Sequence, residues 1–192
     1  MDQNKLMANT KMLEECFKKF DLEIVNKKNQ TVTDINHTEF SSSIFLNGAG
    51  QQTFNAKYYH ELNMIEVCFY LKLDFESRLR EAIAHLLNLI NSLRNDSFWA
   101  ICSCCNEIEM RYATMIKDVI SKSYLERMFK KSLFLAKTFT PLILHLIASK
   151  DDPYQLSKEF FLNNRYLAMR RIIAKYDEKN PNVVYIDEMA LD

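Results

Sequence analysis

The segment TFNAKYYHELNMIEVCFYLKL, residues 53–73, constrains the fold more than any other part of the chain. In its second half, apolar and polar side chains alternate with a period of two, which is typical of a strand with one buried face. One face carries Ile65, Val67, Phe69 and Leu71, and the other carries Glu66, Cys68, Tyr70 and Lys72. Residues 60–63, HELN, have the character of a turn, so the segment predicts an antiparallel hairpin.

A helix is predicted directly after this hairpin. The apolar side chains of FESRLREAIAHLLNLINSLR, residues 75–94, recur at helical spacing and define one buried face. Asp74 is a suitable N-cap residue. A strand pair followed by a helix, with no βαβ alternation, favours an α+β fold over an α/β fold.

A second hairpin is predicted over residues 98–113, with a turn at Asn106-Glu107. It contains the cluster Cys102, Cys104 and Cys105. On a strand Cys102 and Cys104 point one way and Cys105 the other, so the three thiols cannot converge. Structural zinc sites use four ligands, usually in paired knuckles. We therefore interpret the cluster as packing inside the sheet; the alternative is a metal or redox site.

The N-terminal part predicts a helix over 9–20 and a strand over 22–27. Residues 26–42 are polar and predict a loop, and SSIFLN at 42–47 predicts a short strand. Toward the C-terminus a long helix begins near Ser123, which has capping-box spacing with Glu126. Pro141 should kink or split it. Asp151-Asp152-Pro153 ends that helix and starts another, which runs to about 176, and residues 179–192 read as a loosely attached tail.

These elements define an α+β fold with an antiparallel sheet and helices on one side. The predicted order is α-βββ-α-ββ-α with an extra C-terminal helix, and a fourth strand in the first group is allowed. We expect a first domain over residues 1–150 and a helical extension with a tail over 151–192.

Three segments resemble the YbjN-like family of bacterial sensory-transduction regulators, which shares its layout with the type III secretion chaperone fold. They are LEECFKKFDLEIV, MIEVCFYLKLDFESRLREAIAHLLNLIN and MIKDVISKSYLERMFKKSLFLAKTFTPLI. The resemblance covers residues 11–150. It departs from the family at Lys117-Asp118-Val119, where a glycine is usual, and in the helix from 153.

The resemblance implies a non-enzymatic cytoplasmic protein without a cofactor. Such a protein acts as a chaperone, adaptor or regulator by binding other proteins, with links to secretion or the stress response. Its partner could be a secreted substrate or a secretion-system component, and a homodimer is a further option. This step is an argument by analogy, because a fold does not dictate a function.

Composition removes several function classes. Gly48 and Gly50 are the chain's two glycines, so there is no glycine-rich phosphate loop. The 25 basic and 25 acidic residues give a formal charge of zero, whereas nucleic-acid binders usually carry a basic excess. We therefore expect no nucleic-acid partner.

The N-terminus lacks the apolar core of a secretory signal, and the odd number of cysteines suggests reduced thiols in a cytoplasmic protein. The stretch SLFLAKTFTPLILHLIAS, which contains His145, predicts a buried helix in preference to a membrane span. His85 should lie on a polar helix face, and His145 reads as a core histidine.

Apolar side chains beyond a single stripe need a second cover, which can be a partner. The helix from 153 to 175 has this character, and sheet edges and apolar grooves are common sites for partner segments. The predicted partner-binding residues are Phe69, Leu71, Phe98, Trp99, Phe160, Phe161 and Tyr166. The alternative hypothesis is a thiol- or metal-dependent enzyme or sensor that uses Cys102, Cys104, Cys105 and a histidine, and a host-directed effector is a third.

Overall fold

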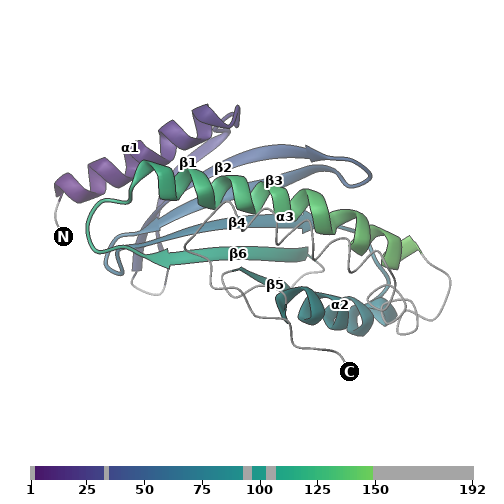
Figure 1. Cartoon of the computed structure of the whole chain (residues 1–192). Coiled ribbons are helices and arrows are strands. Elements are labelled where there is room, and N and C mark those ends of the chain that lie inside the picture. Colours follow the sequence, from purple (N-terminus) through teal and green to yellow (C-terminus); the bar gives the residue numbers. More distant parts are fainter. Residues whose placement is uncertain (1–2, 33–34, 93–96, 103–106, 149–192) are drawn as a thin grey trace, which may run out of the picture.

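A computed structural model describes residues 3–32, 35–92, 97–102 and 107–148. Six antiparallel strands form one sheet in the order β1-β2-β3-β4-β6-β5 (Figure 1). The strands are β1 (Asn26–Val32), β2 (Ile35–Leu46), β3 (Gly50–Tyr59), β4 (Met64–Lys72), β5 (Phe98–Ile101) and β6 (Glu107–Met115). The helical elements are α1 (Gln3–Lys19), the 3-10 turn η1 (Ser77–Leu79), α2 (Arg80–Ser92) and α3 (Lys122–Ala148).

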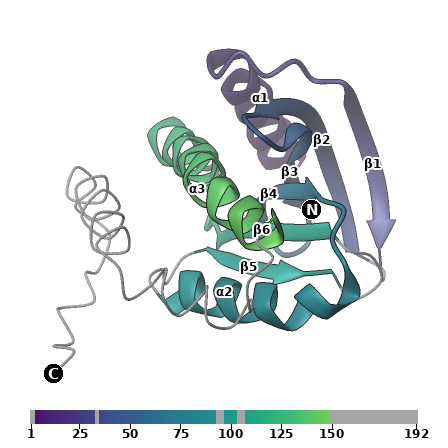
Figure 2. The ribbon, with the colours of Figure 1, turned by 90° about the vertical axis from the view of Figure 1, so that its right-hand side faces the viewer.

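The helices form one layer against the sheet. Figures 1 and 2 show α1 and α3 across one face, while α2 runs along β5 at the edge of the sheet. This arrangement confirms the predicted α+β class, and the observed order is α-ββββ-α-ββ-α. The predicted helix after residue 153 and the domain division near residue 150 lie outside the described residues.

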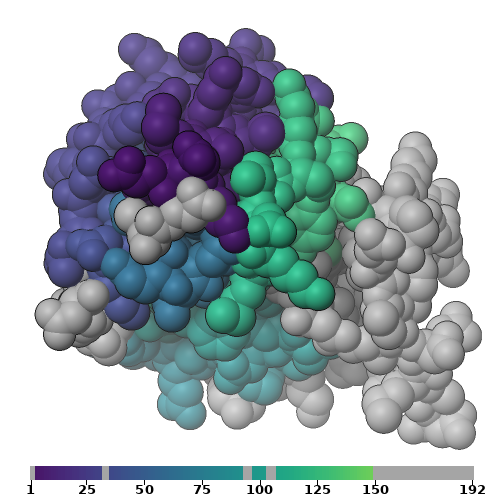
Figure 3. Space-filling model, turned by 90° about the vertical axis from the view of Figure 1, so that its left-hand side faces the viewer, coloured from purple at the N-terminus to yellow at the C-terminus, as the bar shows by residue number. Residues whose placement is uncertain are grey.

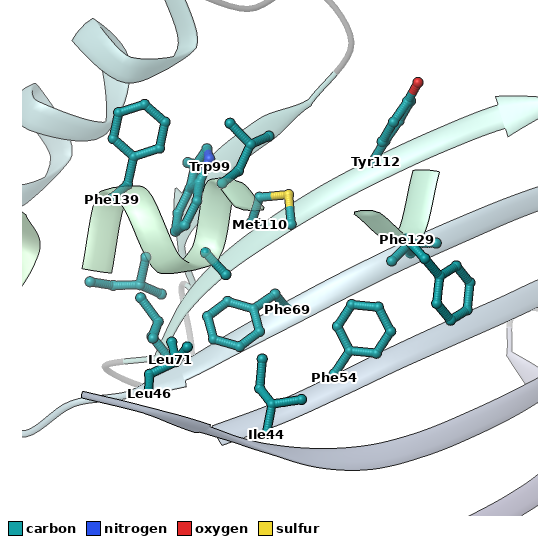
Figure 4. Close-up of a cluster of buried hydrophobic side chains, with 14 of the residues drawn as sticks. Ile44, Leu46, Phe54, Phe69, Leu71, Trp99, Met110, Tyr112, Phe129 and Phe139 are labelled. Atoms are coloured by element: carbon teal, nitrogen blue, oxygen red, sulfur yellow. The ribbon is translucent and has the colours of Figure 1, made fainter. Parts of the chain in front are cut away.

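Aromatic side chains fill the space between the sheet and the helices. Phe17 of α1 and Phe129 of α3 meet edge to face, with ring centroids 5.2 Å apart, and both contact Phe54 of β3 at 6.0 and 5.3 Å. At the other end of α3, Phe139 lies edge to face on Trp99 at 6.0 Å (Figure 4). Such pairs add to the large apolar area that each ring buries.

Both predicted hairpins are confirmed. β3 and β4 pair from Thr53 opposite Tyr70 to Tyr59 opposite Met64, around the predicted turn at 60–63. β5 pairs with β6 from Phe98 opposite Arg111, but the turn predicted at Asn106-Glu107 is wrong at Glu107, which is the first residue of β6. The alternation in β4 is confirmed as well, since its odd-numbered side chains belong to the core under the helices.

The predicted loop over 26–42 is wrong, because these residues form β1 and much of β2. β1 is an edge strand, so it buries little and can be polar throughout. In β2 the core face contains Phe40, Ser42, Ile44 and Leu46, and the three serines at 41–43 weaken the visible alternation. The strand expected over 22–27 begins only at Asn26.

Three predicted helix starts are also wrong, and the first is that of α1, which begins at Gln3 and not at residue 9. The chain after β4 stays non-helical through Glu76, and η1 then leads into α2, so Asp74 caps no helix. α3 begins at Lys122, where the Tyr124 amide donates to the Ser121 hydroxyl at 3.3 Å. Ser121 therefore takes the N-cap role that we had assigned to Ser123, and Glu126 instead pairs with Lys19 of α1 at 2.5 Å.

α3 runs through Pro141 as one helix, so the proline does not split it. The helix is long and apolar enough to pass a composition test for a membrane span, with half of the tested window buried in this fold. Its buried residues pack on the sheet and on α1 and α2, as a core helix does.

Two asparagines hold the loop between β6 and α3. Asn9 of α1 is fully buried; its side-chain oxygen accepts from the Ile120 amide at 2.9 Å and its amide donates to the Asp118 carbonyl at 3.3 Å. Asn63, in the turn after β3, accepts through its carbonyl from the Ile116 amide at 2.8 Å. The loop and the start of α1 lie side by side in Figure 3.

Candidate functional site: the two edges of the sheet

Helix α2 covers the β5 edge of the sheet at Trp99. The register and the bond from the Cys102 amide to the Glu107 carbonyl at 2.8 Å show that the backbone N–H and C=O groups of residues 98, 100 and 102 point toward β6. The backbone groups of Trp99 therefore point away from the sheet. Asn91 of α2 takes both: its Oδ1 accepts from the Trp99 amide at 2.7 Å, and its Nδ2 donates to the Trp99 carbonyl at 2.9 Å.

Asn91 thus makes the two hydrogen bonds that a residue on a neighbouring strand would make. Arg80, at the start of α2, adds a bond from Nη2 to the Cys102 carbonyl at 2.9 Å. Covering an edge with a helix is a common way to prevent strand addition. A partner strand cannot pair with Trp99 unless Asn91 first moves away.

The β1 edge is different, because β2 is its one sheet neighbour in the described structure. Val32 and Ile35 pair across a two-residue connection, so they form a hydrogen-bonded pair. In an antiparallel ladder, hydrogen-bonded and non-hydrogen-bonded residue pairs alternate. The backbone groups that bond to β2 are therefore those of Asn26, Lys28, Gln30 and Val32. The backbone groups of Lys27, Asn29 and Thr31 then point outward and are available to a seventh strand.

Side chains on β1 make this edge polar and basic. The strand NKKNQTV contains two lysines and no acid. Lys27 lies on the helix side, 2.6 Å from Glu14 and over the Phe40 ring, whereas Lys28 is exposed on the opposite face, across from Glu39 of β2. Edge lysines discourage pairing with apolar or like-charged strands. The edge therefore favours an extended segment with acidic side chains.

The structure separates the predicted partner-binding residues. Phe69, Leu71 and Trp99 are buried in the core under the helices. Phe98 lies on the opposite face and is 57% exposed. Phe160, Phe161 and Tyr166 lie outside the described residues, so their role stays a prediction.

The sheet face away from the helices carries a polar cluster around Glu66 and Cys68, both buried. The Cys68 thiol donates to Glu66 Oε1 at 2.8 Å, and the Tyr59 hydroxyl donates to the same oxygen at 3.3 Å. Arg111 Nη1 lies 4.0 Å from Glu66 Oε2. The carboxylate is thus surrounded by two donors and a cation, as a buried charge requires.

Burial and the charge of Glu66 raise the pKa of the Cys68 thiol well above its ordinary value of 9.0, and the same two causes raise the pKa of Tyr59. Burial, followed by the charge of Glu126, raises the pKa of Cys16 to about 11. Reactive cysteines need a lowered pKa. Cys16 and Cys68 therefore remain protonated thiols with structural roles.

The cysteine cluster of the alternative hypothesis is described only at Cys102, which is half-buried just after β5. Cys104 and Cys105 lie outside the described residues, so the interpretation of the cluster as core packing stays a prediction. Within the described ranges, no group of three histidine, cysteine or acidic side chains could hold a metal ion.

The histidines are dispersed over the fold. His145 is exposed on α3, so the prediction of a core histidine is wrong, because it faces away from the sheet. His85 is half-buried on α2. His37 is buried beside Tyr59, and His60 Nε2 lies 3.0 Å from the Thr38 hydroxyl.

Comparisons with known proteins give one result of note. No family model matches the chain, and no curated protein matches it. Among solved structures, the fold is similar to that of YbjN from E. coli, described as a "putative transcription regulator", with a TM-score of 0.45 and 10% identity. The match covers 71% of this chain and 89% of YbjN. YbjN gives its name to the family that the sequence resembles.

Proposed function

We propose that the chain is a non-enzymatic protein-binding module that adds an extended acidic segment of a partner protein to β1. The observation that carries this proposal is the contrast between the two edges. Asn91 occupies the outward groups of Trp99 on β5, whereas three residues of β1 direct their backbone groups outward.

Strand addition supplies affinity through main-chain hydrogen bonds and specificity through alternate side chains. At β1 those side chains are Lys27 on one face and Lys28 on the other, so acidic residues on both faces of a partner strand are favoured. A cytoplasmic chaperone, adaptor or regulator is the cellular role that the family resemblance implies, and it belongs to the same proposal.

The protonated thiols of Cys16 and Cys68 argue against these two residues as nucleophiles in a thiol-dependent enzyme. No specific observation on the described residues favours a second function, so we propose protein binding alone.

Thr31 offers a matched test. Its amide points outward, so Thr31→Pro removes an outward donor without breaking a bond to β2, and proline is tolerated at such edge positions. Thr31→Val also loses the exposed hydroxyl bond to Asn36 but keeps the amide, so it is the control. Tagged proteins at natural abundance would be recovered from native cells and their partners quantified by mass spectrometry.

The expected result is one near-stoichiometric protein that the wild type and Thr31→Val retain and Thr31→Pro loses. Equal recovery of that protein by Thr31→Pro would exclude β1 as its binding site.

A further inference from the structure

We propose that residues 183–188 of the chain's own tail, VVYIDE, occupy β1 as a seventh strand and so compete with the external partner. This inference rests on the proposed function, because the tail and the external partner would bind the same open β1 edge. Bound there, the tail would regulate the partner's access to that edge.

The tail segment has the composition that β1 favours. Val183, Val184, Tyr185 and Ile186 are β-branched or aromatic and have high strand propensity. Asp187 and Glu188 follow at once, so acidic side chains fall on both faces of such a strand. Pro181 precedes the run and sets its start, since proline is tolerated at the first residue of a strand or before it.

An antiparallel register pairs the charges without conflict. With Glu188 opposite Lys28, the glutamate lies on the outer face and Lys28 lies between it and Glu39 of β2. Asp187 is then opposite Asn29 on the helix side and diagonal to Lys27, which already contacts Glu14. Opposite charges directly across or diagonal on one sheet face are favourable cross-strand pairs.

A second copy of β1 fits this edge less well. Antiparallel pairing of two β1 strands about Asn29 places Lys28 diagonal to its own copy on the outer face, with no acid from either strand to separate them. Charge complementarity therefore selects the tail over self-association.

The chain is long enough for the tail to reach β1 of the same molecule. Residues 149–182 separate the end of α3 from the segment. If residues 153–175 are helical they span about 35 Å, and the remaining residues of this link add about 36 Å when extended. A domain of this size is roughly 40 Å across. Figure 2 shows β1 at the margin of the sheet, where a strand can approach it.

Amide hydrogen exchange in the full chain, read by NMR, tests the proposal. The outward amides of Asn29 and Thr31 exchange freely on an open edge and are protected when they pair with Asp187 and Tyr185 of a seventh strand. In the wild type we expect these two amides to exchange at least about tenfold more slowly than in the variant Asp187→Lys/Glu188→Lys. The matched control, Asp177→Lys/Glu178→Lys, makes the same charge change outside the segment and should exchange like the wild type.

Charge reversal gives a second readout. Lys28→Glu alone should raise exchange at Asn29, and combining it with Glu188→Lys should restore protection. Equal exchange in the wild type and Asp187→Lys/Glu188→Lys would overturn the proposal. Protection that increases with protein concentration would overturn it too, because it would identify a second copy as the occupant.

The two proposals fail separately. Unprotected β1 amides in the wild type would remove the tail as occupant, and partner recovery by Thr31→Val but not Thr31→Pro would still support the external partner. Protected β1 amides with equal recovery by both Thr31 variants would keep the tail and remove the partner from β1.

Discussion

The side-chain amide of Asn91 pairs with both outward backbone groups of Trp99, accepting at 2.7 Å and donating at 2.9 Å. This one helix residue distinguishes the two edges, because it pairs with the outward groups of Trp99 on β5, whereas Lys27, Asn29 and Thr31 on β1 keep theirs directed outward.

Asn91→Ala should open the β5 edge. The change leaves the amide and carbonyl of Trp99 without their partners, and we expect a loss of about 1–3 kcal/mol in the free energy of unfolding. It should also raise self-association, because an uncovered edge can pair with another chain. Urea unfolding and light scattering measure the two effects. Asn88→Ala, an exposed asparagine on the same helix, is the control and should change neither.

Asn91 illustrates what the sequence could and could not predict. The helix around it was predicted from apolar spacing, which reports the face buried against the core. The bond to Trp99 depends on where α2 lies beside β5, and asparagine on a helix gives no signal of that placement.

β1 shows the same limit for strands. Its seven residues lack apolar alternation because an edge strand on this sheet buries little, so composition indicated a loop. The strand is fixed by its ladder with β2, which is a long stretch of main-chain bonding and not a side-chain pattern. Conversely, β4 was predicted face by face because Phe69 and Leu71 are fully buried.

Trp99 and Phe98 are neighbours in the chain, but their substitution should change the free energy of unfolding by very different amounts. Trp99 is buried against Phe139, so Trp99→Ala should cost about 3–5 kcal/mol of unfolding free energy. Phe98→Ala should stay within about 0.5 kcal/mol, since the ring is mostly exposed. Chemical denaturation measures both. A large loss in Phe98→Ala would show that its ring is covered in solution, as a partner-binding residue would be.

The loop between β6 and α3 depends on its buried bonds more than on its surface ion pair. Asn9→Ala leaves the Ile120 amide buried without an acceptor and should cost about 1–3 kcal/mol. Lys5→Ala removes the exposed ion pair with Asp118 and should cost well under about 1 kcal/mol. Thermal unfolding of the two variants measures the difference. Equal losses would contradict the role assigned to Asn9.

Cys16 predicts a pH dependence in the alkaline range. Its folded pKa of about 11 exceeds the ordinary value of 9.0, so the folded state holds the proton more tightly between these values. The contribution of Cys16 to stability is complete below pH 9 and falls as the pH rises toward 11. Urea unfolding across this range should show a shallower decline in Cys16→Ala than in the wild type. An identical decline would place the thiol in a less buried setting.

Site-specific photo-crosslinking in native cells tests the central claim most directly. A photoreactive residue at position 30 places the probe on the same outer face of β1 as Lys28 and keeps both lysines, and one at position 88 places it on α2. We predict that position 30 forms an adduct with a protein other than the chain itself and that position 88 forms none. An adduct with the same protein from position 88 alone would contradict β1 as the binding edge.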